Sequence, residues 1–323
     1  MSTKLVRFEY ETHIRWGVVQ DDQVYALTNE FATTSELVRA LPRLSLAAAI
    51  ADQKPVPLDS VKLLAPITAN QQFICQGANY RQHMLESGVD PDAKHFNMLF
   101  TKAPSCIVPA DSDVIRPHRV RFLDYEVELG LVLRKDLDRP ASVTAANLHE
   151  FVAAVVIVND YSARDIQIPE MQFYKGKSFR TFGPVGPYLV LIDANNIHCL
   201  SNLNLSLAVN GQPRQTDSTR NMVHGPAETL TEVSQIHNLQ AGDLIATGTP
   251  SGCALAIPSP GKQRIAALLP ERLKWKLFLQ AQAKRTQYLQ PGDLVEASIK
   301  SPDGTLDLGT QRNHIRAEAE VEL

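Results

Sequence analysis

The chain has 323 residues, of which 44% are hydrophobic, so it can bury a large core as one domain or as two domains of unequal size. Charged residues make up 21% and the formal net charge is -3, which argues against a general affinity for nucleic acid or acidic membranes. The four cysteines show neither CxxC nor Cys/His spacing, so neither a zinc site nor a disulfide framework is indicated. We find no apolar leader and no stretch near the ~18 uncharged apolar residues of a membrane span. We therefore expect a soluble cytoplasmic protein whose partners are small molecules.

Hydrophobic periodicity divides the chain into two parts. Residues 4–27 alternate short apolar runs with a polar turn and predict a small β-meander, and residues 34–50 predict one or two short helices. Prolines at positions 55 and 57 then hold the chain extended, so we place a boundary between a small N-terminal accessory domain, residues 1–67, and a larger domain, residues 68–323.

The larger part reads as short hydrophobic strands separated by turns rich in Gly, Pro and Asp. Helices are predicted around His83, over residues 145–152 and over residues 271–284. The predicted fold class is therefore mostly β with short helices (α+β).

A strand is predicted over residues 124–133, where apolar side chains recur with period two. Glu126 and Glu128 then point to the same face of this half-buried strand. At ~3.3 Å rise per residue they are roughly 6 to 7 Å apart, so their carboxylates repel each other unless something positive lies between them. A hard cation would fill that gap.

A second strand, predicted over the apolar run 151–158, presents Asp160 at its end, where it could join the two glutamates. Three carboxylates without a nearby Cys or His form an all-oxygen site, which favours magnesium, manganese or calcium over zinc. The alternative is that Glu126 and Glu128 form a solvated strand face and that Asp160 caps a helix beginning at Tyr161.

His83 and Glu86 lie three residues apart, so on a helix the carboxylate could orient the imidazole and raise its basicity for water activation. This spacing is also common on surface helices. Lys177 follows a glycine and precedes a rigid turn, where it could stabilise an oxyanion or enolate, although a surface lysine is the default. Thr249 lies in a loop of small residues that could approach a ligand or form an ordinary turn.

These segments together resemble the fumarylacetoacetate hydrolase family, whose motifs occur here in the family's order. The matching pieces are Gly77–Tyr80 with His83 and Glu86, Tyr125–Leu129, Asn159–Gln167, Gly176–Phe179, Val209–Gly211 and Gly248–Gly252. The resemblance is strong over residues 68–254 and loose over the amino-terminal residues. It implies a mixed β-roll or barrel that forms the catalytic domain over residues 68–323, with a small N-terminal domain before it.

The resemblance also implies a metal and a cation beside it. Glu126, Glu128 and Asp160 would bind Mg2+ or Mn2+, with Ca2+ also fitting an oxygen site. Lys177 would approach the substrate's oxo group.

Five further residues receive roles from the resemblance. His83 and Glu86 would form a water-activating dyad. Arg164 and Gln167 would bind the carboxylate or acyl side of the substrate, and Thr249 would complete the pocket.

From the family resemblance we predict a divalent-metal-dependent homodimeric hydrolase that cleaves a C–C bond in an acylpyruvate or a related 1,3-dioxo acid. Such a substrate chelates a hard cation, and breaking the bond next to a carbonyl leaves an enolate that a dication and a lysine stabilise. The same site would suit a 2-oxo acid decarboxylase, isomerase or hydratase. A catalytically silent protein that binds a 2-oxo acid is a third alternative.

Residues 255–290 depart from the family's usual short loop and form an atypical insertion. Leu273, Leu277 and Ala281 recur there at helical spacing. The insertion could be a lid, an oligomer contact or a packed surface helix.

Overall fold

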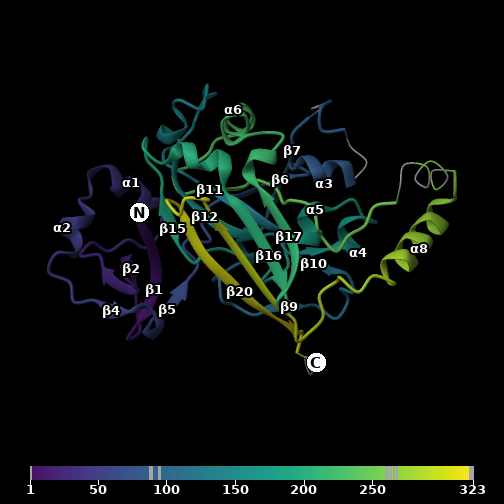
Figure 1. The fold of residues 1–323 in the computed structure, drawn as a ribbon, viewed down its shortest axis with the longest axis horizontal. Helices are drawn as coiled ribbons and strands as arrows, with labels where there is room; N and C mark the ends of the chain where they lie inside the picture. Colours follow the sequence, from purple (N-terminus) through teal and green to yellow (C-terminus); the bar gives the residue numbers. More distant parts are fainter. Residues whose placement is uncertain are drawn as a thin grey trace.

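The structure is a computed structural model that describes residues 2–86, 90–93, 96–258, 261, 264, 266 and 268–319. Strands dominate it and the helices are short, so the fold is α+β and mostly β, as predicted. A large sheet and a smaller one lie at its centre (Figure 1). Parts of the predicted insertion, residues 259–260, 262–263, 265 and 267, lie outside the described residues.

The large sheet has eleven strands and combines the N-terminal strands β1 to β5 with strands from the middle of the chain. Across the sheet they are β4 (Val56–Pro57), β3 (Gln23–Ala26), β2 (His13–Gln20), β1 (Lys4–Tyr10), β15 (Leu189–Leu191), β12 (Val152–Asn159), β11 (Val127–Leu133), β18 (Leu244–Ala246), β6 (Phe73–Gly77) and β7 (Met98–Lys102), with β5 (Lys62–Leu64) paired to β1. These pairs are antiparallel except for β18 with β6, which is parallel.

The smaller sheet packs near the large one and is supplemented by two short strand pairs. Its five strands, in order, are β17 (Gln212–Ser218), β16 (Asn204–Val209), β19 (Leu294–Lys300), β20 (Asp307–Ala317) and β9 (Val114–Arg116). The short pairs are β10 (Leu123–Asp124) with β13 (Ser162–Ala163) and β8 (Ile107–Val108) with β14 (Gly183–Pro184).

Short helices connect the strands. The described α-helices are α1 (Thr34–Ala40), α2 (Leu46–Ile50), α3 (Arg81–Glu86), α4 (Arg164–Gln167), α5 (Phe173–Lys177), α6 (Pro226–Ile236) and α8 (Glu271–Gln282). Within the described residues, no helix is both long and apolar enough to cross a membrane.

The N-terminal residues form the predicted β-meander, because β1 pairs with β2 and β2 with β3 in antiparallel register. The two predicted helices are α1 and α2, and the side chain of Thr33 caps α1 by accepting the backbone N–H of Glu36. β1 also pairs with β15, so the meander extends the large sheet instead of standing apart from it. The division of the chain at residues 67/68 therefore stays a prediction.

Strands β11 and β12 are buried on both faces, and this corrects the half-buried strand predicted over residues 124–133. One face of the pair, with Leu129 and Ile157, packs into the core that also contains residues of the smaller sheet. The opposite face, with Val132 and Val156, packs into a second core that includes residues of α1. The face that carries the glutamates is therefore interior, because layers cover the sheet on both sides.

Two of the three predicted helices form. α3 includes His83, and α8 occupies most of residues 271–284, with Leu273 and Leu277 exposed. The helix predicted over residues 145–152 is wrong: only a 3-10 turn forms there, at Leu148–Glu150, and β12 begins at Val152. The apolar run that follows draws these residues into a buried strand.

Gly176 allows α5 to lie against α4. A Cβ at this position would be 2.7 Å from the Cβ of Gln167 and 2.9 Å from its backbone nitrogen. We expect Gly176→Ala to lower the free energy of unfolding by about 1–3 kcal/mol, the usual cost of overpacking, although alanine normally favours a helix. Urea unfolding measures this change.

Lys175→Ala, at the exposed neighbouring position, is the matched control and should stay within about 0.5 kcal/mol of the wild type. A Gly176→Ala protein as stable as the wild type would show that the contact between α4 and α5 is looser than the structure indicates.

Candidate active site

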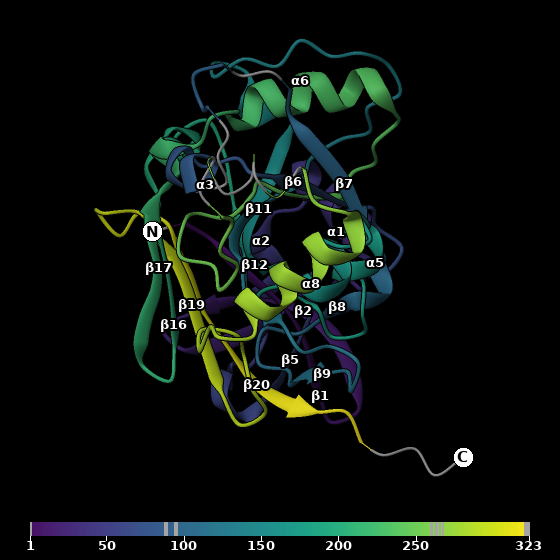
Figure 2. The ribbon, with the colours of Figure 1, turned by 90° about the vertical axis from the view of Figure 1, so that its right-hand side faces the viewer.

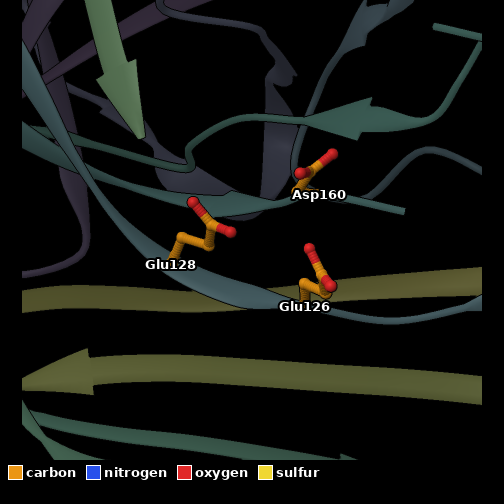
Figure 3. A group of neighbouring side chains, drawn as sticks. All are labelled: Glu126, Glu128 and Asp160. Carbon is orange, nitrogen blue, oxygen red and sulfur yellow. The ribbon is translucent and has the colours of Figure 1, made fainter. Parts of the chain in front are cut away.

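The register of β11 and β12 brings three carboxylates together. Val127 lies opposite Asn159, and the Asp160 N–H donates to the Glu126 carbonyl at 2.8 Å. Oxygen atoms of Glu126, Glu128 and Asp160 lie within 4.8 Å of one another. Figure 3 shows the three side chains directed into one space between the strands.

Burial rules out the alternative of a solvated acidic face. Glu126, Glu128 and Asp160 are 5%, 1% and 0% exposed. The predicted helix at Tyr161 is also absent, because β13 follows and the helix α4 begins only at Arg164. The three carboxylates thus form one interior group.

Two buried lysines meet this group. Nζ of Lys177 donates to Glu126 at 2.6 Å and to Asp160 at 2.5 Å, and Nζ of Lys102 donates to Asp160 at 2.5 Å and to the Phe182 carbonyl at 2.8 Å. Burial alone would lower the pKa of each lysine, but the neighbouring carboxylates outweigh it and raise both pKa values. Both amines therefore stay charged.

Sequence reasoning missed Lys102. Its signal is a lysine at the end of the short run Met98–Lys102, which enters the interior as β7. A buried lysine requires a partner, and Asp160 supplies one.

Arg164, the first residue of α4, holds the acidic group from the other side. Its guanidinium donates to Asp124 at 2.8 Å, to Gln167 at 2.7 Å and to Glu126. Burial alone would raise the pKa of Glu126, but Arg164 and Lys177 lower it to about 2. These contacts orient a carboxylate of the site, and the substrate contact implied for Arg164 stays a prediction.

The charges do not balance, and the excess lies at Glu128. Four carboxylates, those of Asp124 and of the group of three, face the three cations Lys102, Arg164 and Lys177. Among the described residues, Glu128 has no ion-pair partner and accepts only the Gly248 N–H, at 2.9 Å. Burial, followed by repulsion from Asp160 and Glu126, raises the pKa of Glu128 well above its usual range.

Three buried carboxylate ligands with an unmatched negative charge fit a hard divalent cation. Gly248 is shaped for its contact: its φ is +86°, and a Cβ there would lie 2.8 Å from the Cβ of Asn79. The oxygen ligands and the excess of one carboxylate over the buried cations therefore both favour a divalent cation at this site.

A cavity of about 520 Å³ opens beside the carboxylates. Its wall includes eight of the nine predicted site residues, namely His83, Glu86, Glu126, Glu128, Arg164, Gln167, Lys177 and Thr249. Asp160 is not part of the wall and lies fully buried. The structure thus brings the predicted residues together in one place.

His83 and Glu86 lie where the sequence predicts them, but the predicted hydrogen bond between them is not found among the described residues. Both residues lie on α3 and line the cavity. Within the part of the chain that the structure describes, no hydrogen bond joins them, and Glu86 accepts one from Gln82 at 3.4 Å. Burial lowers the pKa of His83, so its imidazole is neutral at pH 7 and can accept a proton.

Thr249 lines the cavity with a hydroxyl that the protein already engages. It donates to the Val127 carbonyl at 3.0 Å and accepts from Gln215 at 2.8 Å. The bond to Val127 fastens the loop after β18 to the start of β11, and the bond from Gln215 fastens it to β17. The contact between Thr249 and substrate that the family resemblance implies stays a prediction.

Comparisons with known proteins agree with this architecture. The family model for the fumarylacetoacetate (FAA) hydrolase C-terminal region matches residues 72–316, and a model described as Rv2993c-like, N-terminal, matches residues 3–66. The oxaloacetate tautomerase YisK of Bacillus subtilis is 38% identical over 206 residues, which cover 63% of this chain and 66% of that protein. The mitochondrial oxaloacetate tautomerase FAHD2A of Bos taurus is 38% identical over 226 residues, 69% of this chain and 68% of that protein.

Solved structures show the same fold. A fumarylacetoacetate hydrolase from Exiguobacterium antarcticum has a TM-score of 0.75 and 31% identity, covering 98% of this chain and 100% of its own. A maleylpyruvate hydrolase from Sphingobium sp. SYK-6, in complex with manganese(II) and pyruvate, has a TM-score of 0.72 with the same coverage, and at 22% identity it shows the fold alone. The family model covers most of the chain and the site residues lie in the matched region, so the chain belongs to the fumarylacetoacetate hydrolase family.

Proposed function

We propose that this protein is a divalent-metal-dependent isomerase that interconverts the enol and keto forms of a 2-oxo dicarboxylic acid such as oxaloacetate. The observation that carries the proposal is the buried group of Glu126, Glu128 and Asp160, with its unmatched negative charge, beside Lys177 in one cavity. The two relatives at 38% identity are oxaloacetate tautomerases, which supports this choice of reaction.

Glu126, Glu128 and Asp160 would hold the cation, and Mg2+, Mn2+ and Ca2+ all suit oxygen ligands. Manganese in the maleylpyruvate hydrolase neighbour supports a divalent ion here. When bound, such a cation polarises a 2-oxo group and lowers the free energy of the enolate.

Lys177 would stabilise the oxygen that becomes negative. Its Nζ is buried and charged, and it lies on the cavity wall between two carboxylates. A fixed ammonium in a site with little water is worth more than one in solution. Gly176 and α4 hold the lysine in this position.

His83 would move the proton. In the keto-to-enol direction the substrate's C3–H bond breaks and an O–H bond forms on the 2-oxo oxygen, so no further reactant is consumed. The neutral His83 imidazole can accept the C3 proton and donate it to the 2-oxo oxygen, and the same two transfers run backward in the reverse direction. Its place on the wall satisfies the first requirement, which is access to the bound substrate.

Hydrolysis of an acylpyruvate, the reaction predicted from the sequence, is the second candidate. The observation that favours it is the presence of both His83 and Glu86 on the cavity wall, where His83 can take a proton from water as the water attacks the distal carbonyl. The C–C bond then breaks and pyruvate leaves as its enolate.

We predict that Mg2+ or Mn2+ raises the melting temperature of the wild type. At a metal concentration of 100 Kd, the stabilisation is about 2.7 kcal/mol. Glu128→Gln should abolish this response and leave the metal-free protein at least as stable as the wild type, because it replaces a buried carboxyl group that has no ion-pair partner with a neutral amide. Differential scanning calorimetry with and without metal measures both effects.

Glu150→Gln, at an exposed position on the same protein, should respond to metal as the wild type does. An unchanged metal response in Glu128→Gln would refute the assignment of the metal ligands.

We further predict that His83→Ala lowers turnover by roughly 10²- to 10⁴-fold, the usual contribution of an acid–base residue, and keeps the metal-induced rise in melting temperature. The enol absorbance of oxaloacetate and the release of pyruvate from acylpyruvates should be followed in parallel. Exposed His118→Ala is the control.

Turnover of oxaloacetate tautomers without acylpyruvate cleavage supports the isomerase, and the reverse pattern supports the hydrolase. Near-normal turnover by His83→Ala on both substrates would remove His83 from the mechanism.

A further inference from the structure

The atypical insertion supplies one wall of the cavity. Leu255, Ala256 and Ile257 line the cavity at the start of this segment, and Arg285 lines it near the end. α8 lies between them, at the end of the molecule opposite the N-terminal strands (Figures 1 and 2). This wall belongs to the part of the chain that departs from the family's short loop.

Hydrogen bonds fasten the two ends of the insertion to each other. Gln282, the buried residue of α8, donates to the Ala256 carbonyl at 2.8 Å and accepts from the Tyr288 hydroxyl at 2.7 Å. Arg285 Nε donates to the Ala254 carbonyl at 2.6 Å. The wall is thus closed by specific contacts.

Asp124 connects this wall to the acidic group. Its carboxylate accepts the N–H groups of Ala254 at 2.7 Å and Leu255 at 3.0 Å, and it also accepts Arg164 Nε at 2.8 Å. Arg164 in turn holds Glu126. The position of the insertion is therefore fixed relative to the proposed metal ligands.

Arg285 carries a charge that the protein does not neutralise. Among the described residues, no carboxylate lies within 4.0 Å of its guanidinium, and its hydrogen bond to Ala254 uses Nε alone, leaving the two terminal nitrogens available. Arg164, on the same cavity, differs because carboxylates occupy it on two sides. A half-buried, unpaired guanidinium in a cavity is suited to bind a carboxylate with two parallel hydrogen bonds.

We propose that Arg285 recognises a second carboxylate, distinct from the one in the 2-oxo acid head, so that the substrates are 2-oxo dicarboxylic acids. This inference rests on the proposed function, because it assumes that the 2-oxo acid end of the substrate binds at the cation that Glu126, Glu128 and Asp160 would hold. Apolar Leu255 and Ile257 would contact the carbon atoms between the two ends. A site built to pair a charge rejects a ligand that lacks it, so Arg285 sets specificity.

The test is isothermal titration calorimetry in the presence of Mg2+ with pairs of 2-oxo acids of equal chain length. Oxaloacetate, 2-oxoglutarate and 2-oxoadipate are compared with 2-oxobutanoate, 2-oxopentanoate and 2-oxohexanoate. The wild type should bind the dicarboxylate at least tenfold more tightly in one or more pairs. Arg285→Gln should remove that difference without changing the affinity for the monocarboxylates, and Arg285→Lys should restore part of it.

Arg272→Gln, at an exposed position on α8, is the matched control and should bind like the wild type. The inference is overturned if the wild type does not discriminate in any pair, or if Arg285→Gln weakens both members of a pair equally. If no 2-oxo acid binds to the wild type with Mg2+, the proposed function itself fails. If only the inference about Arg285 fails, 2-oxo monocarboxylates still bind to the wild type and to Arg285→Gln with Mg2+. If the proposed function fails, they bind to neither protein.

Discussion

The charge balance of one buried group governs this site. Burying Glu126, Glu128 and Asp160 together is unfavourable unless cations compensate them. Lys102, Lys177 and Arg164 supply three positive charges for these three carboxylates and the carboxylate of Asp124, so Glu128 is left with a backbone N–H. That remainder is what a dication would neutralise, and the same requirement explains why two lysines lie in the protein interior.

The pairing of two neighbouring strands brings the three carboxylates together. β11 and β12 pair in the middle of the large sheet, so Glu126 and Asp160 leave neighbouring strands at the same end. Cores on both faces exclude water from the pair. The low dielectric of this environment strengthens each charge interaction, and the cavity gives a substrate access to one side of it.

Much of the site could be predicted from the sequence, because period two places Glu126 and Glu128 on one face and an apolar run leads to Asp160. Periodicity reports alternation within one strand but not what covers each face, so the burial of both faces was missed. Lys102 and Asp124 were missed because their partners are distant in sequence, 58 and 40 residues away respectively. The helix predicted over residues 145–152 failed because tertiary burial overrode local pattern.

The most direct test of the account is a crystal structure of the protein grown with Mn2+ and pyruvate, with anomalous data collected at the manganese edge. We predict one strong anomalous peak within about 2.0–2.4 Å of carboxylate oxygens from Glu126, Glu128 and Asp160. The absence of a peak there, with ordered side chains, or a peak bound by other residues would contradict it.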